Sequence, residues 1–437
     1  MNRMKTIIKL VLLVALACAS IDSFAGPAIE SWKTQKGTKV LFIAAPQIAM
    51  LDARVTFDAG SARDGVRKGL ASATNQLLVE GAGTYDADMF SALLGRTGAI
   101  LENGTRRDMA FMGIRTLTES DNLRASLDLL RLAVTKPRFD ESAVARVKAQ
   151  TIIRMRVASQ QPGVIAEQEF YKQLYDNHPY SSPPDGEPRT VEQIEREDLV
   201  FFHRSFYVAE NALITLVGGI DRKQAELIAE EISSGLAKGT APPSLPSPEE
   251  STVGFFSQDF PSIQSHVRVG ALGLKRKDKD YFPLLVGNHV LGGNPLVSIL
   301  FNEVRAKRGL SYSVYSYFLP LAENGPFLIS LQTSGPQKDE AISTVKTALE
   351  KFLSEGPSEE ELISAKKNLI GSFPLRIDSN KELVNYASMI GFYDLPLDYL
   401  EQFPKKIADV TMQDVTDSFR RRVKLQKLVT VIVGPDS

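Results

Sequence analysis

The stretch LITLVGGID at residues 213–221 recurs as LVTVIVGPD at residues 428–436. Leu, Thr, Gly and Asp stand at the same places in both copies, and the positions between them are mostly apolar. A second pair lies at nearly the same offset, ARVTFDAGS at 53–61 and VRVGALGLK at 267–275. Two matches of this kind indicate an internal duplication, so we expect two homologous halves.

Each half runs from strands through several amphipathic helices and back to strands. Helical periodicity is clear in DNLRASLDLLRLAV at 121–134 and in DEAISTVKTALEKFL at 339–353. Strands and helices do not alternate strictly, as they would in a parallel α/β fold. The pattern therefore favours an α+β fold, in which helices pack on one face of a mostly antiparallel sheet in each half.

A proline-rich stretch, AKGTAPPSLPSPEEST at 237–252, separates the two halves. It has no apolar periodicity, which predicts an extended connection that faces solvent. We therefore expect a first domain over 26–238, a linker over 239–252 and a second domain over 253–437. A chain of 437 residues is long enough for two domains that each bury their own core.

The first 25 residues have a basic start, a short apolar run and the small-x-small sequence Ser23-Phe24-Ala25. This pattern predicts a signal peptide over residues 1–25, because the apolar run is too short to cross a bilayer comfortably. Anchoring as a lipoprotein through Cys18 is the alternative. Cys18 is the one cysteine, so the exported chain would rely on packing instead of disulfides. We expect a periplasmic protein with no membrane span.

The overall composition excludes several function classes. Hydrophobic residues make up 43% and charged residues 24%, as in ordinary soluble domains. A formal net charge of −1 offers no electrostatic footprint for a nucleic acid. The four histidines are too far apart in the sequence for a metal-binding pair on one helix, and no CxxC or HExxH occurs. No G-x-S-x-G elbow is present for a serine hydrolase.

The stretch GLASATNQLLVEGAG at 69–83 predicts a helix that ends on glycines. Ser72, Asn75 and Gln76 follow one another at i, i+3 and i+4, a spacing that places them on one helical face. They lie beside leucines that should be buried. The helix therefore turns three neutral polar side chains inward, none of which can ionise near neutral pH.

The stretch LVSILFNEVRAKRGLSYSVYSYFLPLAENGPF at 296–327 predicts a helix, a break at Gly309 and an aromatic strand over 311–317. Arg305 and Arg308 lie near the end of that helix, where cations suit the helix dipole. The apolar face of the helix consists of Leu296, Ile299, Leu300 and Val304. On spacing alone, this is a helix cap that leads into a strand.

The run GGNPLVSILFNEVRAKRGLSYSVYSY at 292–317 resembles the signature of the C-terminal half-domain in the pitrilysin/insulinase family of zinc peptidases. HPYSSPP at 178–184, LRLAVTKPRFDESAVARVK at 130–148 and the duplicated organisation resemble the family in the same order along the chain. The resemblance implies two homologous α+β domains of the metallopeptidase type, which form half of a clamshell around an unfolded peptide.

In active members of the family, the helix that follows Gly-Leu-Ala carries an inverted H-x-x-E-H motif that binds zinc and supplies the general base. By this resemblance, Ser72 and Gln76 stand at the histidine positions and Asn75 stands at the base. The third zinc ligand falls near Ile153, and no carboxylate occurs in 150–156. These residue types are poor zinc ligands and bases, so we expect no metal in this chain and no hydrolysis by it alone.

Complementary subunits of the family supply an arginine and a tyrosine, seven residues apart, that bind the peptide and stabilise the oxyanion. The resemblance places this pair at Arg305 and Tyr312. Arg308 and Tyr315 have the same spacing and remain the alternative, as further substrate-binding residues.

The resemblance also implies that Gly292 and Gly293 contact incoming peptide, as the family's glycine-rich stretch does. It further implies a non-catalytic subunit of a heterodimeric zinc peptidase, whose partner carries an intact H-x-x-E-H motif and the zinc. The loss of the zinc residues beside a retained arginine and tyrosine favours this function, because drift would tend to erode both sites. The alternative is a peptide-binding or envelope-assembly scaffold with no role in catalysis, which a homodimer would fit better.

Overall fold

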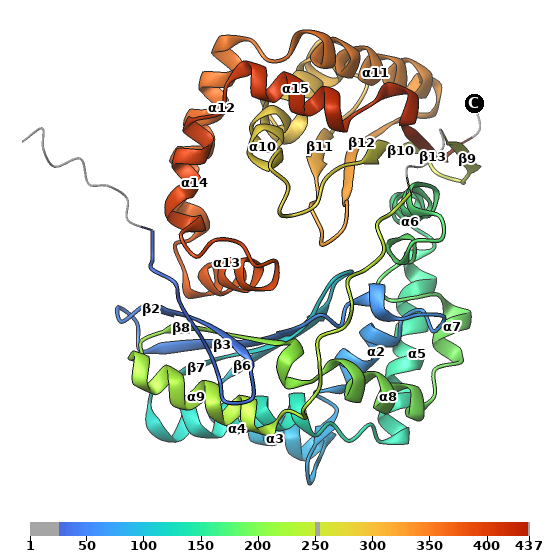
Figure 1. Cartoon of the computed structure of the whole chain (residues 1–437). Coiled ribbons are helices and arrows are strands. Elements are labelled where there is room, and N and C mark those ends of the chain that lie inside the picture. Colours follow the sequence, from blue (N-terminus) through green and yellow to red (C-terminus); the bar gives the residue numbers. More distant parts are fainter. Residues whose placement is uncertain (1–25, 250–253, 436–437) are drawn as a thin grey trace, which may run out of the picture.

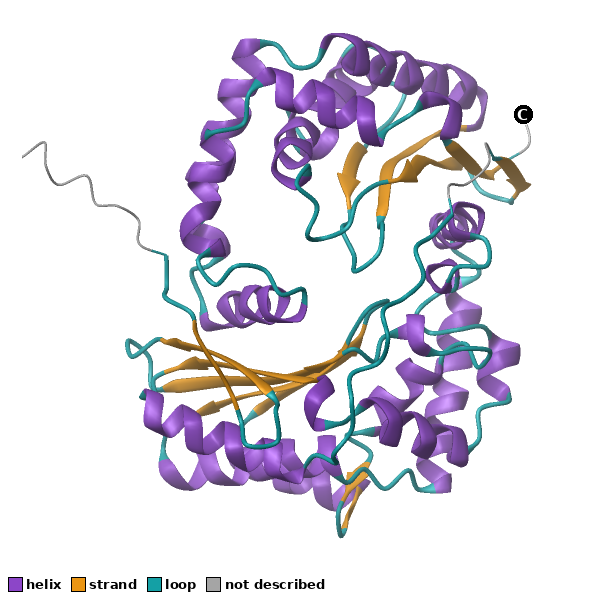
Figure 2. Ribbon diagram, in the orientation of Figure 1, coloured by secondary structure: helices purple, strands orange, loops and turns teal. Residues whose placement is uncertain are grey.

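The computed structural model describes residues 26–249 and 254–435. The expected signal peptide and Cys18 lie outside the described residues. The two sequence halves form two layered units that lie one above the other, with the first half lower in Figure 1. Figure 2 shows that each unit contains a sheet whose outer face is covered by helices, as the α+β prediction requires.

The first unit is built on a six-stranded sheet with the order β1-β2-β8-β3-β7-β6. Its strands are β1 (Glu30–Lys33), β2 (Lys39–Ala44), β3 (Met50–Phe57), β6 (Ile100–Thr105), β7 (Ala110–Leu117) and β8 (Ala212–Gly218). All neighbouring strands are antiparallel except β2 and β8, which are parallel. A separate small hairpin consists of β4 (Gly81–Ala82) and β5 (Tyr85–Asp86).

The second unit is built on a five-stranded sheet with the order β11-β12-β10-β13-β9. Its strands are β9 (Phe255–Asp259), β10 (Gln264–Leu272), β11 (Val314–Phe318), β12 (Pro326–Ser334) and β13 (Val429–Gly434). Only β9 and β13 are parallel. This order repeats β6-β7-β3-β8-β2 of the first sheet strand by strand. The internal duplication is therefore confirmed, and its two signature stretches are the equivalent interior strands β8 and β13.

Helices pack around both sheets. Those of the first half are α2 (Leu70–Leu77), α3 (Ala87–Thr97), α4 (Ser120–Thr135), α5 (Glu141–Ala158), α6 (Pro162–Tyr175), α7 (Pro188–Glu192), α8 (Arg196–Phe206) and α9 (Arg222–Gly235). Those of the second half are α10 (Tyr281–Asn288), α11 (Lys338–Glu355), α12 (Glu359–Ser372), α13 (Asn380–Phe392), α14 (Tyr399–Ala408) and α15 (Met412–Arg422). Two π-helical turns, η4 (His289–Gly293) and η5 (Phe301–Ala306), connect α10 to β11.

One helix of each unit packs on the sheet of the other unit. Helix α13 of the second half packs on β2, β3 and β8 of the first sheet, and α6 of the first half packs on β10 and β13 of the second (Figure 1). Gly391 of α13 lies so close to Leu213 that a Cβ atom would come within 2.7 Å of that side chain. Phe170 of α6 is fully buried against the second sheet. Both sheets are therefore covered on their second face, which the sequence did not predict.

Three local predictions need correction. Helix α2 ends at Leu77 instead of running to the glycines, because Gly81 already adopts a φ of +114° in the hairpin that follows. Strand β11 begins at Val314, since the Ser311 hydroxyl binds the backbone carbonyl of Ser313 at 2.6 Å in a turn. Leu296 was expected on a buried helical face but is 67% exposed, because the helical turn η5 begins later in the chain.

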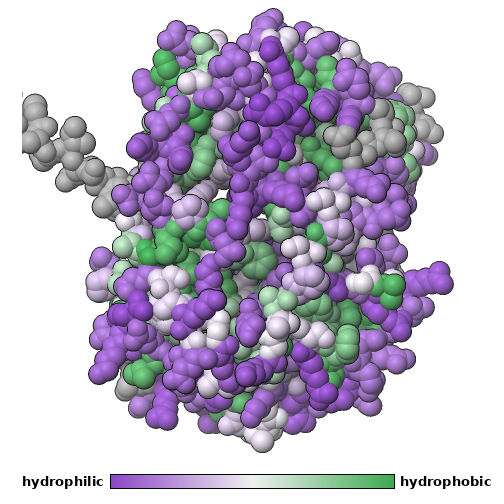
Figure 3. Space-filling model, in the orientation of Figure 1, coloured by the Kyte–Doolittle hydropathy of each residue, from purple (hydrophilic) through white to green (hydrophobic). Residues whose placement is uncertain are grey.

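The connection between the units is extended, and side chains hold it in place. Described residues 238–249 form neither helix nor strand. Arg63 donates to the carbonyl of Pro243 at 2.8 Å, and the His178 ring bonds the carbonyl of Pro246 at 2.8 Å. Polar residues predominate on the face of the molecule that Figure 3 shows. No helix in the described part of the chain has the length and apolar character needed to cross a membrane.

Candidate functional site

A buried carboxylate holds the start of helix α2. Asp64 accepts hydrogen bonds from the backbone N–H groups of Gly69 and Ala71, each at 2.7 Å. Gly69 adopts a φ of +93°, and a Cβ atom there would lie 2.5 Å from the carbonyl oxygen of Asp185. Glycine is therefore needed for this close approach. Burial raises the pKa of Asp64 to about 7.

The polar face of α2 points inward, as the spacing predicted. Ser72 is 5% exposed, and its hydroxyl donates to Asp185 Oδ1 at 2.7 Å. The Gln76 amide nitrogen donates to Ser72 Oγ at 3.0 Å. The Gln76 amide oxygen accepts from Arg154 Nη2 at 2.8 Å. These four side chains form a continuous hydrogen-bonded chain.

Asn75 occupies the position of the general base. It is 1% exposed, and its amide nitrogen donates to the Phe111 carbonyl at 3.1 Å. Its amide oxygen accepts from Asn103 Nδ2 at 3.1 Å. Both ends of the amide are thus satisfied by the neighbouring sheet. Asn75 fastens α2 to β6 and β7, and it carries no group that could accept a proton from water.

The structure places Ile153, where we expected the third position of the zinc motif, on the exposed side of α5. Ile153 is 58% exposed, whereas Thr151 is 4% exposed. Arg154 Nη2 bonds both Thr151 Oγ1, at 3.0 Å, and Gln76 Oε1. Residues 151 and 153 lie on different sides of a helix with 3.6 residues per turn, and Thr151 is the one that shares Arg154 with the α2 motif.

The residues at this motif do not fit a zinc ion. The set consists of a hydroxyl, two carboxamides and a threonine, and each makes hydrogen bonds to protein groups. The Arg154 guanidinium lies beside them and would repel a cation. Within 26–249 and 254–435, no group of three or more His, Cys, Asp or Glu residues is placed to hold a metal ion.

Arg305 and Tyr312 come together in the second unit. Arg305 lies on η5, and its guanidinium carbon is 4.8 Å from the centroid of the Tyr312 ring. The same carbon is 5.2 Å from the ring centroid of Phe301, so the cation is held between two aromatic faces. Tyr312 is 78% exposed. Among the described residues, no carboxylate forms an ion pair with Arg305.

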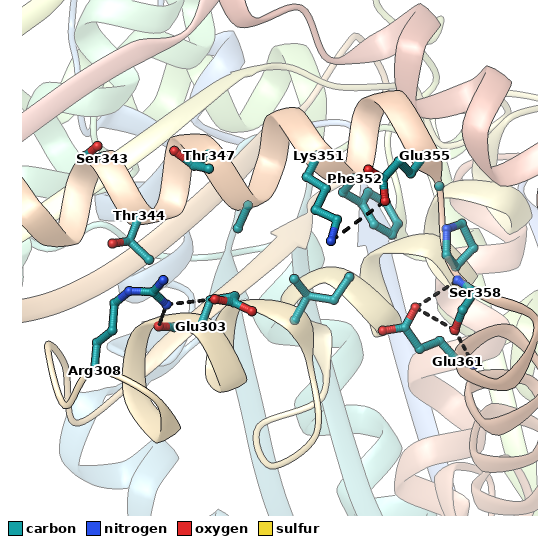
Figure 4. A pocket seen from close by; sticks show the side chains of 14 residues that line it. Glu303, Arg308, Ser343, Thr344, Thr347, Lys351, Phe352, Glu355, Ser358 and Glu361 are labelled. Atoms are coloured by element: carbon teal, nitrogen blue, oxygen red, sulfur yellow. Dashed lines mark hydrogen bonds and ion pairs between the residues drawn. The ribbon is translucent and has the colours of Figure 1, made fainter.

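The alternative pair does not come together in this way. Arg308 donates to Glu303 Oε2 at 2.7 Å and to the Glu303 carbonyl at 2.8 Å. Figure 4 shows this ion pair in a pocket of about 680 Å³ between η5, α11 and the start of α12. Hydrogen bonds from Lys307 and Arg308 lower the pKa of Glu303. Tyr315 instead stacks on Tyr317, with ring centroids 6.3 Å apart.

The two glycines differ in their surroundings. Gly292 is buried, and a Cβ atom there would lie 2.4 Å from Ser316 Oγ and 2.8 Å from the Ser316 backbone nitrogen. Asn288 stabilises this contact, because its amide oxygen accepts the Ser316 hydroxyl at 2.7 Å and its amide nitrogen donates to the Ser316 backbone carbonyl at 2.9 Å. Gly293 is exposed. Gly292 therefore allows close packing against β11, and a contact with peptide stays a prediction for Gly292 and Gly293.

A further group of residues lies beside the motif and was missed in the sequence. Arg107 and Arg154 line a pocket of about 370 Å³ together with Tyr171 and Asp185. Arg154 stands within the stretch 150–156, where only the missing carboxylate had been noted. No sequence pattern points to Arg107, because only the folding of the chain brings it beside α5 and α6.

Comparison with known proteins agrees with this architecture. Residues 39–184 match the model of the insulinase family, peptidase family M16, and residues 193–369 match the peptidase M16 inactive domain. A crystal structure of a peptidase M16 inactive domain from Pseudomonas fluorescens is 36% identical, with a TM-score of 0.91. That likeness covers 93% of this chain and 98% of the other.

Two further relatives are more distant. An uncharacterized zinc protease of Bacillus subtilis is 24% identical over 322 residues, which are 74% of this chain and 78% of that protein. A protease from Helicobacter pylori has a TM-score of 0.84 at 19% identity, covering 94% of this chain and all of that one. The latter likeness shows the fold alone.

The fold and the site define a two-domain chain that forms one half of a peptidase clamshell and in which the zinc motif has been replaced. The chain belongs to peptidase family M16, the insulinase family. The match to the inactive domain, together with the lost ligands at Ser72 and Gln76, indicates a non-catalytic M16 chain.

Proposed function

We propose that this chain is the non-catalytic subunit of a heterodimeric zinc peptidase of the periplasm. Its partner is a homologous chain with an intact H-x-x-E-H motif, which supplies the zinc and the general base. This chain completes the chamber around an unfolded peptide and presents Arg305 and Tyr312 to the partner's site. The single observation that carries the proposal is the contact of Arg305 with the exposed Tyr312 in a chain whose own zinc motif is replaced.

The chemistry of the pair suits a developing oxyanion. Arg305 is a cation that is not paired with a carboxylate among the described residues. Two aromatic rings limit the directions in which its guanidinium can point. The Tyr312 hydroxyl is a donor on the same exposed surface. Donors held in place before the reaction stabilise the charge that forms in the transition state.

The proposed location follows from residues 1–25, whose pattern is that of an export signal. A mature chain without cysteine suits an oxidising compartment. The glycine-rich turn at Gly293 is proposed to contact peptide as it enters. Its exposure in the structure supports this role.

The proposal is tested by co-expressing this chain with a homologous chain that has an intact motif, and by measuring cleavage of unfolded peptides. The pair is expected to cleave, and each chain alone is expected to cleave far more slowly. Full activity of the partner alone would overturn the proposal and would favour a scaffold. So would a failure of the two chains to form a complex in size-exclusion chromatography.

A further inference from the structure

The pocket of about 370 Å³ beside the replaced zinc motif has a chemical character of its own. It lies between α5, α6 and the loop at residues 183–186. Two arginines line it among largely apolar walls. The residues used below are Arg107, Arg154, Glu167, Tyr171 and Asp185, with Met155, Val164 and Pro183 among the walls. Asp185 and Arg154 also bond Ser72 and Gln76, so the pocket and the motif share an edge.

Arg154 is anchored at one end and has free donors at the other. Both of its hydrogen bonds, to Gln76 and Thr151, use the nitrogen Nη2. A guanidinium has five N–H donors, so those on Nε and Nη1 have no partner among the described residues. Arg154 also forms no ion pair within that part of the chain. The cation is therefore positioned by neutral acceptors and is not paired with a carboxylate among the described residues.

Arg107 is fixed in a similar way from the opposite wall. Its guanidinium carbon lies 3.6 Å from the centroid of the Tyr171 ring, and its Nε donates to the Tyr180 carbonyl at 3.0 Å. The N–H groups on its two terminal nitrogens make no hydrogen bond to the residues that the structure describes. These two terminal nitrogens form the fork that binds a carboxylate bidentately.

The acidic residues of the pocket narrow the class of ligand. Asp185 accepts the Ser72 hydroxyl, and Glu167 lies on α6 beside the arginines. Two nearby carboxylates would repel a doubly charged phosphate more strongly than a singly charged carboxylate. The apolar walls offer contact to the side chains and the stem of an organic ligand, which an inorganic anion lacks.

We propose that this pocket binds a carboxylate group of a peptide, with Arg154 and Arg107 as its cationic donors. Beside the replaced zinc motif, this chain places a guanidinium that is hydrogen-bonded to Gln76. A guanidinium attracts a carboxylate but cannot activate a water molecule for attack. The pocket is thus a holding site for an acidic side chain or a C-terminus. That the ligand is a peptide rests on the proposed function.

The test measures binding to this chain alone by fluorescence anisotropy, with three labelled peptides of one neutral sequence. One has a free C-terminal carboxylate, one is amidated, and one is amidated but contains an internal glutamate. Either carboxylate peptide should bind about tenfold more tightly than the neutral amide, and the stronger of the two identifies the source of the carboxylate. Equal binding of all three peptides would overturn the proposal, without any need for a variant.

Variants then locate the site. Arg154→Gln and Arg107→Gln should each weaken binding of the carboxylate peptide by about tenfold. Arg156→Gln removes the same charge from the same helix, outside the pocket, and should leave binding unchanged. An equal loss for Arg156→Gln would show a general effect of charge and would overturn the proposal. Inorganic phosphate that competes at lower concentration than acetate would overturn the choice of a carboxylate.

The two proposals fail in different experiments. Binding to this chain needs no partner, whereas cleavage does. Carboxylate binding that depends on Arg154, in a chain that never supports cleavage, would refute the proposed function and leave the pocket assigned. Cleavage by the pair, with identical binding of all three peptides, would refute the pocket alone.

Discussion

Arg154 Nη2 donates a hydrogen bond to Gln76 Oε1 at 2.8 Å, across 78 positions of sequence. The amide oxygen is the one atom of Gln76 that could have bound a metal, and a cation already occupies it. The same nitrogen reaches Thr151, the buried residue of α5 beside the motif. The replaced motif therefore forms an ordered hydrogen-bonded network that includes the positive charge of Arg154. Its geometry can be tested by restoring the zinc ligands.

Zinc binding should return only when the third ligand is placed correctly. We expect the combination Ser72→His, Asn75→Glu, Gln76→His and Arg154→Leu to bind about one zinc when Thr151→Glu is added. A matched variant with a glutamate at Ile153 instead should bind much less, because that side chain is exposed. Metal content after dialysis measures both, with circular dichroism to check folding. Tighter binding by the variant at Ile153 would contradict the placement.

Two arginines three residues apart should differ sharply in the co-expressed pair. Arg305→Gln should lower kcat/KM by about a hundredfold, the cost of one oxyanion donor. Arg308→Gln should change it little, because Arg308 is paired with Glu303. Tyr312→Phe should reduce the rate and Tyr315→Phe should not. Steady-state cleavage by each assembled pair gives the comparison. A larger effect at Arg308 would assign the role to the alternative pair.

Gly292 should tolerate no side chain. Gly292→Ala would place a Cβ atom 2.4 Å from Ser316 Oγ, and we expect a loss of about 1–3 kcal/mol in the free energy of unfolding. Gly371 in α12 has open space around it, so Gly371→Ala should instead stabilise the chain by about 0.5–1 kcal/mol. Urea denaturation measures both. An unchanged midpoint for Gly292→Ala would show that η4 can move away from β11.

A buried carboxylate ties the two units together. Asp108 is 3% exposed and accepts the Tyr393 hydroxyl at 2.8 Å and the Ala322 backbone N–H at 2.8 Å. Tyr393→Phe should cost about 1.5–3 kcal/mol, the value of a hydrogen bond to a charged group. Tyr85→Phe is the control, because the described residues offer its hydroxyl no hydrogen bond. Denaturation that shows equal stability for both variants would contradict this role of Asp108.

Asp64 should make stability depend on pH. Its pKa is about 7 in the folded chain and about 4 when unfolded. Below about pH 4 the folded and unfolded states both hold the proton, so the contribution of Asp64 to the free energy of unfolding is then at its full value. Between about pH 4 and pH 7 the unfolded state releases its proton first, so stability falls, by up to about 4 kcal/mol.

Asp64→Asn cannot titrate. Its free energy of unfolding should be lower at pH 4, because the NH2 of a carboxamide cannot accept from either N–H group of Gly69 and Ala71, whereas both oxygens of a protonated carboxyl keep lone pairs. It should nevertheless fall less between pH 4 and pH 7 than that of the unmodified chain. Thermal denaturation across this range measures the difference. Parallel profiles for the two proteins would contradict the raised pKa.

Features that depend on local pattern could be predicted from the sequence. The duplicated strands β8 and β13 have short apolar runs, so their equivalence could be read without the fold. The inward face of Ser72, Asn75 and Gln76 follows from a helical repeat of 3.6 residues. The loss of the zinc motif follows from residue identity. Boundaries were less accurate, since Gly81 and Ser311 end or delay elements through contacts that periodicity does not report.

The sequence by itself determined two homologous α+β units and the absence of the zinc motif, because each follows from residue patterns within short stretches of the chain. Only the tertiary structure decided that α6 and α13 cover each other's sheets. It also decided that Arg154 stands at the motif and that Asp108 joins the units. These contacts link residues 78 to 285 positions apart. Long-range contacts of this kind leave no periodic signal, because each depends on how both units pack around the chain between them.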